Sequence, residues 1–288
     1  MSPIQTPAGV PAKRRRASPK RTARPGGAVG RALTVAAVIA AAGVAATAAL
    51  WASLPDPAPL ASRLPTTTAL VEQRRAEARP DRRAFRLDLR PVGLDRISPR
   101  LAEAVRLSED ASFFGHRGFD WREIRNAAEQ NLKAGHTVRG ASTLTQQLAK
   151  NLWLGTERTW LRKAREALLT VKLERSLSKQ RILAVYLNVV EWGDGVFGAE
   201  AAARHWFGVG AGELSAAQAA ALAAMLPAPR RAGLSPAPAW LARRARRVLA
   251  WMAQAGTIGE AEHARARAEL EDLLRAPPDA GDEEPPAD

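Results

Sequence analysis

The chain has 288 residues, 46% of them hydrophobic, and a formal net charge of +14, which is enough apolar material for one or two folded domains. It contains no cysteine, which excludes disulfides, thiol catalysis and zinc sites built on thiolates. Its four histidines stand apart with no HExxH or HxH spacing, which argues against a transition-metal site built by the protein.

A basic arm opens the chain, and an uncharged segment follows it. The arm, residues 1–31, holds eight Lys and Arg and no acid, and residues 32–54 read ALTVAAVIAAAGVAATAALWASL. About 20 apolar residues suffice to cross a bilayer core, so we predict a transmembrane helix over 32–54. The positive-inside rule places the arm in the cytoplasm and the later residues outside it. A cleaved signal peptide is the alternative, because Ala46, Thr47 and Ala48 resemble a cleavage site.

The next residues change from Pro-rich to helical patterns. Residues 55–83 begin with PDPAPLASRLPTTT and are predicted to be a linker, and the alternation in AFRLDLRPV indicates a short strand. Ser98 before Pro99 predicts an N-cap, and Thr143 and Ser215 each begin a capping box. Further helices are expected over 159–176, 179–191, 198–206, 238–254 and 260–274.

These patterns predict an all-α, mainly helical body over 84–255. Residues 256–288 are expected to form a C-terminal helix and a disordered acidic tail. The run GDGVFG (193–198) is interpreted as a loop, because no βαβ pattern surrounds it. The run RRARR (243–247) is interpreted as a solvated helix face, with a lipid-headgroup patch as the alternative.

The stretch SEDASFFGHRGFDW (108–121) concentrates acids among aromatic residues. Glu109 and Asp110 end a predicted helix, where the negative end of the helix dipole disfavours carboxylates. A carboxyl held against apolar rings is desolvated, and its raised pKa suits it to accepting a proton near neutral pH. His116 and Asp120 are interpreted as supports of the turn.

Two further stretches are rich in hydrogen-bond donors and cations. In RGASTLTQQLAKN (139–151), Ser, Thr and Gln side chains open a helix, which is a natural site for anions or sugar hydroxyls. In RKAREALLTVKLE (162–174), Arg162 and Glu166 stand four residues apart, and alone they would be an ordinary helical ion pair.

Five motifs in succession resemble the peptidoglycan glycosyltransferase family, in its monofunctional biosynthetic branch. They are SEDASFFGHRGFD, RGASTLTQQLAKN, RKAREALLTVKLE, KQRILAVYLNVVEWGDGVFGAEAAARHWFG and LSAAQAAALAAMLPAP, and they span roughly 84–230. The resemblance implies a lysozyme-like helical domain at the outer face of the cytoplasmic (inner) membrane. It also implies an enzyme that polymerises lipid II into β-1,4 glycan with inversion and release of undecaprenyl pyrophosphate.

The resemblance implies roles for individual side chains. Glu109 would be the general base that deprotonates the acceptor 4-hydroxyl, and Glu166 the second carboxylate, near the leaving group. The implied substrate-binding positions are Asp110, Ser142, Gln146, Gln147, Lys150, Asn151, Arg162 and Lys163. Lys150, Arg162 and Lys163 match positions that bind pyrophosphate. No cofactor is required and no metal site is certain, but Mg²⁺ or Mn²⁺ can accompany a pyrophosphate.

The expected partners are lipid II, the growing glycan chain, membrane lipids and proteins of cell-wall synthesis or division. No nucleic-acid partner is expected, because nothing resembles a groove-reading element. One position departs from the family pattern ILExYLN: Ala184 stands where a Glu is usual. The alternatives are a lysozyme-like glycan-cleaving enzyme, which needs no cationic cradle, and a degenerate membrane-anchored scaffold with weak activity.

Overall fold

The computed structural model describes residues 26–78, 85–135, 140–155, 159–234 and 236–275, and it divides into two compact units at residues 52 and 53. Most of the basic arm and the acidic tail therefore lie outside the described residues. The described part of the first unit is the helix α1, Gly26–Ser53, whose last residue already belongs to the second unit.

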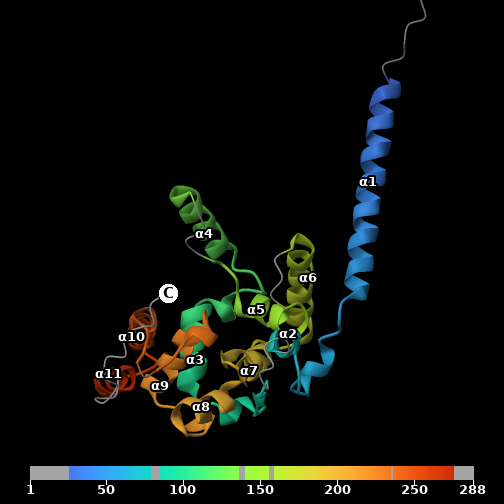
Figure 1. Ribbon diagram of the computed structural model, residues 1–288. Helices are drawn as coiled ribbons and strands as arrows, with labels where there is room; N and C mark the ends of the chain where they lie inside the picture. The colour runs from blue at the N-terminus through green and yellow to red at the C-terminus, as the bar shows by residue number, and fades with distance from the viewer. Residues whose placement is uncertain (1–25, 79–84, 136–139, 156–158, 235, 276–288) are drawn as a thin grey trace, which may run out of the picture. The chain divides into compact units, whose positions relative to one another are not determined.

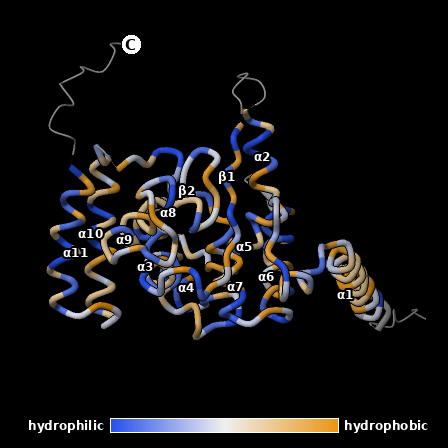
Figure 2. The backbone as a smooth tube through the Cα atoms, turned by 90° about the horizontal axis from the view of Figure 1, so that it is seen from below, coloured by the Kyte–Doolittle hydropathy of each residue, from blue (hydrophilic) through white to orange (hydrophobic). Residues whose placement is uncertain are grey.

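The helix α1 is hydrophobic along most of its length (Figure 2). Residues 30–53 form a stretch of 24 residues whose most apolar 18-residue window has a mean hydropathy of 2.2, which is long and apolar enough to cross a membrane. Its two threonine hydroxyls donate to carbonyls one turn back, from Thr34 to Gly30 (2.9 Å) and from Thr47 to Gly43 (2.8 Å). These bonds satisfy the hydroxyls within the helix, as a bilayer core requires.

The second unit is mainly helical, which confirms the predicted fold class (Figure 1). Its α-helices are α2 (Ala69–Ala78), α3 (Pro99–Glu109), α4 (Trp121–Ala134), α5 (Leu144–Trp153), α6 (Trp160–Ser176), α7 (Lys179–Val189), α8 (Ala199–Phe207), α9 (Ala216–Met225), α10 (Ala239–Gln254) and α11 (Glu260–Leu274). Its strands are β1 (Asp88–Leu89), β2 (Glu191–Gly193) and β3 (Val196–Phe197). They form one small sheet in the order β1-β3-β2, with β1 parallel and β2 antiparallel to β3.

The core is built around α9, an alanine-rich helix that is buried at every residue except Gln218. A helix that is apolar on all sides belongs in an interior, and alanine side chains let neighbouring helices approach closely. The helices α3, α10 and α11 pack on it, and α3 and α10 also pack on each other. A second group, α5 with α6 and α7, packs beside them (Figure 1).

The segment before α2 is attached to this body. Leu54 is buried in the core, and Leu60 and Leu64 pack against it. The Lys172 ammonium donates to the carbonyl of Leu54 at 2.9 Å. The Arg181 guanidinium likewise donates to backbone carbonyls farther along the segment, within residues 60–63. Side chains of α6 and α7 therefore hold the chain just after α1.

The structure differs from the sequence-based expectations at five places. The helix expected over 179–191 ends at Val189, and Glu191 already belongs to β2. Ser98 precedes α3 but does not cap it, because its hydroxyl donates to the carbonyl of Leu214 at 3.0 Å. The run interpreted as a loop, 193–198, contains most of the β2–β3 hairpin, and Gly198 at its end does open α8. Two helices were not predicted: α2, which lies within 55–83, and α4.

Candidate active site

Glu109 is the last residue of α3, and its carboxylate lies at the junction of the two helix groups. Its side chain is 12% exposed. The Gln147 amide of α5 donates to Oε2 at 3.0 Å, and the Arg244 guanidinium of α10 donates to Oε1 at 2.7 Å. Burial raises the pKa of Glu109, although the bonds from Gln147 and Arg244 and the charge of Lys150 act in the opposite direction. The structure thus places here a carboxylate with a raised pKa.

Asp110 supports this position from the next residue. Its carboxylate accepts the backbone N–H of Leu144 at 3.0 Å, which ties the end of α3 to the first turn of α5. The Gly118 N–H donates to His116 Nδ1 at 3.1 Å, so the proton of a neutral imidazole lies on Nε2 and is donated to Asp110 at 3.0 Å. Both side chains are engaged within the protein.

Asp120 and Gly118 organise the turn that follows. Asp120 caps α4 by accepting the backbone N–H groups of Arg122 and Glu123, each at 3.0 Å, and it also accepts the hydroxyl of Ser112. The Ser112 bond is the main cause of the lowered pKa of Asp120. Gly118 has a φ of +91°, and a Cβ there would lie 2.7 Å from a methyl carbon of Thr170. The nearby rings pack on one another and on His116.

The first turn of α5 holds the polar residues of the second motif in different environments. Thr143 and Gln146 form a capping box, with the Gln146 carbonyl accepting the Thr143 N–H at 3.1 Å. Ser142 is exposed just before the helix, and Asn151 is buried near its end. Of this set, Gln147 is the residue that contacts Glu109.

Glu166 lies on α6 and is paired with two cations of its own helix. Arg162 donates to Oε2 at 2.7 Å and the Lys163 ammonium donates to Oε1. Glu166 is 3% exposed, so its carboxylate is buried, whereas the Lys163 side chain is 47% exposed and reaches the solvent.

Lys150 connects the two carboxylates electrostatically. Its ammonium interacts with the charges of both Glu166 and Glu109, and burial lowers its pKa. The ammonium forms no hydrogen bond or close ion pair with another residue that the structure describes. A partly buried cation without a partner is available to an anionic ligand.

The cluster has four cations, Lys150, Arg162, Lys163 and Arg244, against the two carboxylates Glu109 and Glu166. An excess of positive charge in a partly buried site stabilises negative charge that develops on a leaving group. The described residues contain no group of three or more potential metal ligands, and both Glu166 oxygens are already paired. These residues do not fit a metal site of the protein's own.

Sequence reasoning missed Arg244. The interpretation of 243–247 as a solvated face is wrong for this residue, although Arg243, Arg246 and Arg247 are exposed. The helical spacing could have indicated that Arg244 is not on the solvated face. Arg244 stands three residues after Leu241 and four before Val248, both of which are buried. That spacing places it beside the apolar stripe of α10 that packs on α3.

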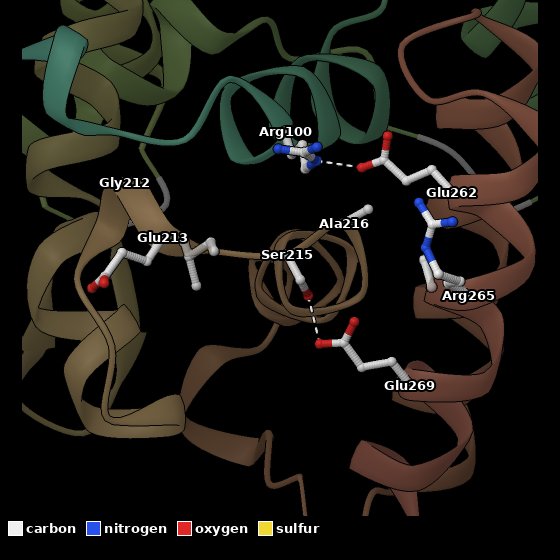
Figure 3. A pocket seen from close by; sticks show the side chains of 10 residues that line it. Arg100, Gly212, Glu213, Ser215, Ala216, Glu262, Arg265 and Glu269 are labelled. Atoms are coloured by element: carbon white, nitrogen blue, oxygen red, sulfur yellow. Dashed lines mark hydrogen bonds and ion pairs between the residues drawn. The ribbon is translucent and has the colours of Figure 1, made fainter.

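The pocket shown in Figure 3 is a different feature. It lies between the beginning of α3, the beginning of α9 and the helix α11, and its lining includes Arg100, Ser215, Arg265 and Glu269. Arg100 is at the opposite end of α3 from Glu109. None of the candidate site residues lines this pocket.

A helical domain with a desolvated carboxylate facing a cluster of cations has the equipment of an enzyme that transfers a group from an anionic leaving group. The Transglycosylase family model matches residues 81–253, and with a match of this extent the chain belongs to that family.

Named relatives agree with this assignment. A "Biosynthetic peptidoglycan transglycosylase" of Laribacter hongkongensis is 56% identical over 169 residues, which cover 58% of this chain and 73% of the relative. Proteins with the same name from Nitrosospira multiformis and Aromatoleum aromaticum are 46% and 49% identical over 191 residues, which cover 66% of this chain and 83% of each relative.

Proposed function

We propose that this chain polymerises lipid II into β-1,4-linked glycan for the cell wall and releases undecaprenyl pyrophosphate. The observation that carries the proposal is the largely buried carboxylate of Glu109, whose pKa is raised by burial, together with the cation cluster around Glu166. The names of the relatives support the same substrate class.

One half of the site suits the acceptor hydroxyl, and the other half suits the pyrophosphate leaving group. Glu109 accepts the proton of the acceptor 4-hydroxyl as the oxygen attacks the donor anomeric carbon and the bond to pyrophosphate breaks. Lys150, Arg162 and Lys163 stabilise the negative charge on the departing pyrophosphate. Because pyrophosphate leaves as a stable anion, this side needs cations more than a strong acid. A divalent ion, if one takes part, would be held chiefly by the substrate's own phosphates.

We further propose that the domain works on the outer face of the cytoplasmic membrane, with α1 as a single-pass anchor and residues 1–31 in the cytoplasm. The basic arm and the apolar helix support this orientation. Trp160, Leu132 and Trp121 are exposed by 92%, 84% and 71% on α6 and α4, and indole rings favour the membrane interface. Within this assignment the catalytic domain covers 84–255, and proteins of cell-wall synthesis or division are the expected partners.

The decisive experiment offers the purified full chain lipid II in one reaction and isolated sacculi in another. We expect glycan polymer from lipid II with wild type, and no polymer with Glu109→Gln, which keeps the shape of the side chain but cannot take up the proton. Soluble muropeptides from sacculi without polymer from lipid II would refute the proposal. Polymerisation undiminished in Glu109→Gln would refute the assignment of the base.

The orientation can be tested by labelling, because the chain has no cysteine. A single cysteine introduced at the exposed Gln254 should react in intact spheroplasts with a membrane-impermeant maleimide, whereas one introduced at Ser18 should react only after lysis. The reverse pattern would overturn the orientation.

A further inference from the structure

Two successive hydrogen bonds connect Glu109 to the interior of the protein. The hydroxyl of Tyr186, on α7, lies 3.0 Å from the Gln147 carbonyl oxygen, and the Gln147 amide nitrogen lies 3.0 Å from Glu109 Oε2. Tyr186 is the only tyrosine of the chain, and it is completely buried. No hydrogen bond between Tyr186 and the carboxylate is found among the described residues, so the hydrogen-bonded connection to Glu109 passes through Gln147.

The direction of these two hydrogen bonds is set by which atoms can donate and which can accept. A glutamine side chain offers an acceptor at one end and a donor at the other, and the two ends can exchange places by a flip. In the orientation found here, the Tyr186 O–H donates to the Gln147 carbonyl and the amide N–H donates to Glu109. After a flip, the Gln147 carbonyl would face the Glu109 carboxylate, and two acceptors would meet.

Tyr186 disfavours that flip. In the flipped state its hydroxyl would accept from the Gln147 amide, and its own O–H would be left buried without an acceptor, which carries a large desolvation penalty. Burial raises the pKa of Tyr186 well above its ordinary value, with the Glu109 charge acting in the same direction. The phenol therefore stays protonated and remains a donor at every pH at which the enzyme would work.

We propose that Tyr186 is a positioning residue that fixes the Gln147 amide so that its N–H stabilises the ionised form of Glu109. The inference deepens the proposed function, because it rests on Glu109 being the general base. Tyr186 would then tune the pH at which the base becomes competent without touching the substrate.

Other groups act on Glu109 and would remain in place when Tyr186 is changed. Arg244 from α10 donates to the other carboxylate oxygen, and Lys150 from α5 contributes its positive charge. Both favour the ionised form. The expected change is therefore a displacement of the Glu109 titration and not its abolition.

The test is the pH dependence of lipid II polymerisation by Tyr186→Phe, which deletes one oxygen and keeps the ring. We expect the acidic limb of the pH profile of kcat/KM to move to higher pH by about one unit. The reason is that the hydrogen bond from Gln147 to the Glu109 carboxylate is weakened. The rate should recover above the displaced limb. A purely structural role would instead lower the rate by the same factor at every pH.

The double variant Gln147→Met, Tyr186→Phe shows whether Tyr186 acts through Gln147. Gln147→Met alone should displace the limb at least as far as Tyr186→Phe, and adding Tyr186→Phe should displace it no further. A displacement by Tyr186→Phe that is undiminished in the Gln147→Met background would overturn the inference. So would an unmoved limb in Tyr186→Phe.

A second readout needs no turnover. The ¹³C resonance of the Glu109 carboxyl, assigned by its loss in Glu109→Gln, should titrate at higher pH in Tyr186→Phe than in wild type. Wild-type titration in a folded Tyr186→Phe protein would overturn the inference. The two proposals fail separately: an active Glu109→Gln refutes the base, whereas an inactive Glu109→Gln with unshifted Tyr186→Phe refutes only the role of Tyr186.

Discussion

Replacing Arg244 by Met tests the electrostatic control of Glu109 most directly. The substitution removes the cation and its hydrogen bond but keeps an apolar stem to pack on α3. Burial raises the pKa of Glu109, and Arg244 holds that rise in check. Without Arg244 the pKa should rise further, so the active, ionised form should appear only at higher pH.

The magnitude follows from the geometry. The two side chains are 28% and 12% exposed and their nearest atoms are 2.7 Å apart, so solvent screens this pair only in part. Hydrogen bonds to charged groups contribute about 1.5–3 kcal/mol, and about 1.4 kcal/mol corresponds to one pKa unit. We therefore expect the acidic limb of the polymerisation rate to move up by about one to two pH units in Arg244→Met.

The assay is kcat/KM for lipid II polymerisation across the pH range, with Arg243→Met as a matched control. Arg243 is the neighbouring residue on α10, it is exposed, and its replacement removes the same charge from the chain. The control should keep the wild-type limb. If Arg244→Met slows the reaction equally at every pH and leaves the limb in place, Arg244 does not set the pKa of Glu109 and the reasoning fails.

Three further predictions concern other parts of the site and its support. Burial lowers the pKa of Lys150, so polymerisation should lose activity at alkaline pH, below the usual lysine range. Lys150→Arg should move that alkaline limb of the pH profile to higher pH, because a guanidinium stays charged. An alkaline limb that does not move would contradict this role of Lys150. Asp120→Ala should lower the free energy of unfolding in urea by about 1 kcal/mol through the lost N-cap. Since Ser112 and the cap lower the pKa of Asp120, that deficit should shrink as the pH falls below the usual aspartate range, and a deficit constant with pH would exclude the ionic contribution. Ala184 is buried, so Ala184→Glu should lower the melting temperature without raising polymerisation, and a gain in activity would show that the missing carboxylate limits this enzyme.

Much of the fold could be predicted, because most helices carry a periodic apolar face and a recognisable boundary. The expected ranges 159–176, 238–254 and 260–274 differ from α6, α10 and α11 by at most one residue at either end. The helix α4 was missed although Trp121, Ile124 and Leu132 recur at helical spacing in its sequence. The structure leaves most of that apolar stripe uncovered, since only Ala127 of this helix is buried. Its Asp120 cap and the Glu123 that follows were further available signals.

The site could be predicted only where its members share a motif or a helix. The pair Arg162 and Glu166 follows from spacing alone, and the resemblance to the family supplied Glu109, Gln147 and Lys150. Their catalytic and binding roles stay predictions, since the geometry describes contacts within the protein and not with a substrate. The contact between Glu109 and Arg244 joins residues 135 positions apart, and no local pattern encodes a contact of that range.

That long-range contact follows from the packing of the core. The alanine helix α9 brings α3 and α10 together, and the last turn of α3 then meets the Arg244 side of α10. The same fold places Tyr186 of α7 behind Gln147 of α5, on the other side of Glu109. The core alanines thus determine which donors surround Glu109. Enlarging one of them should move the pH limb as well as the stability, which links the interior of the fold to its chemistry.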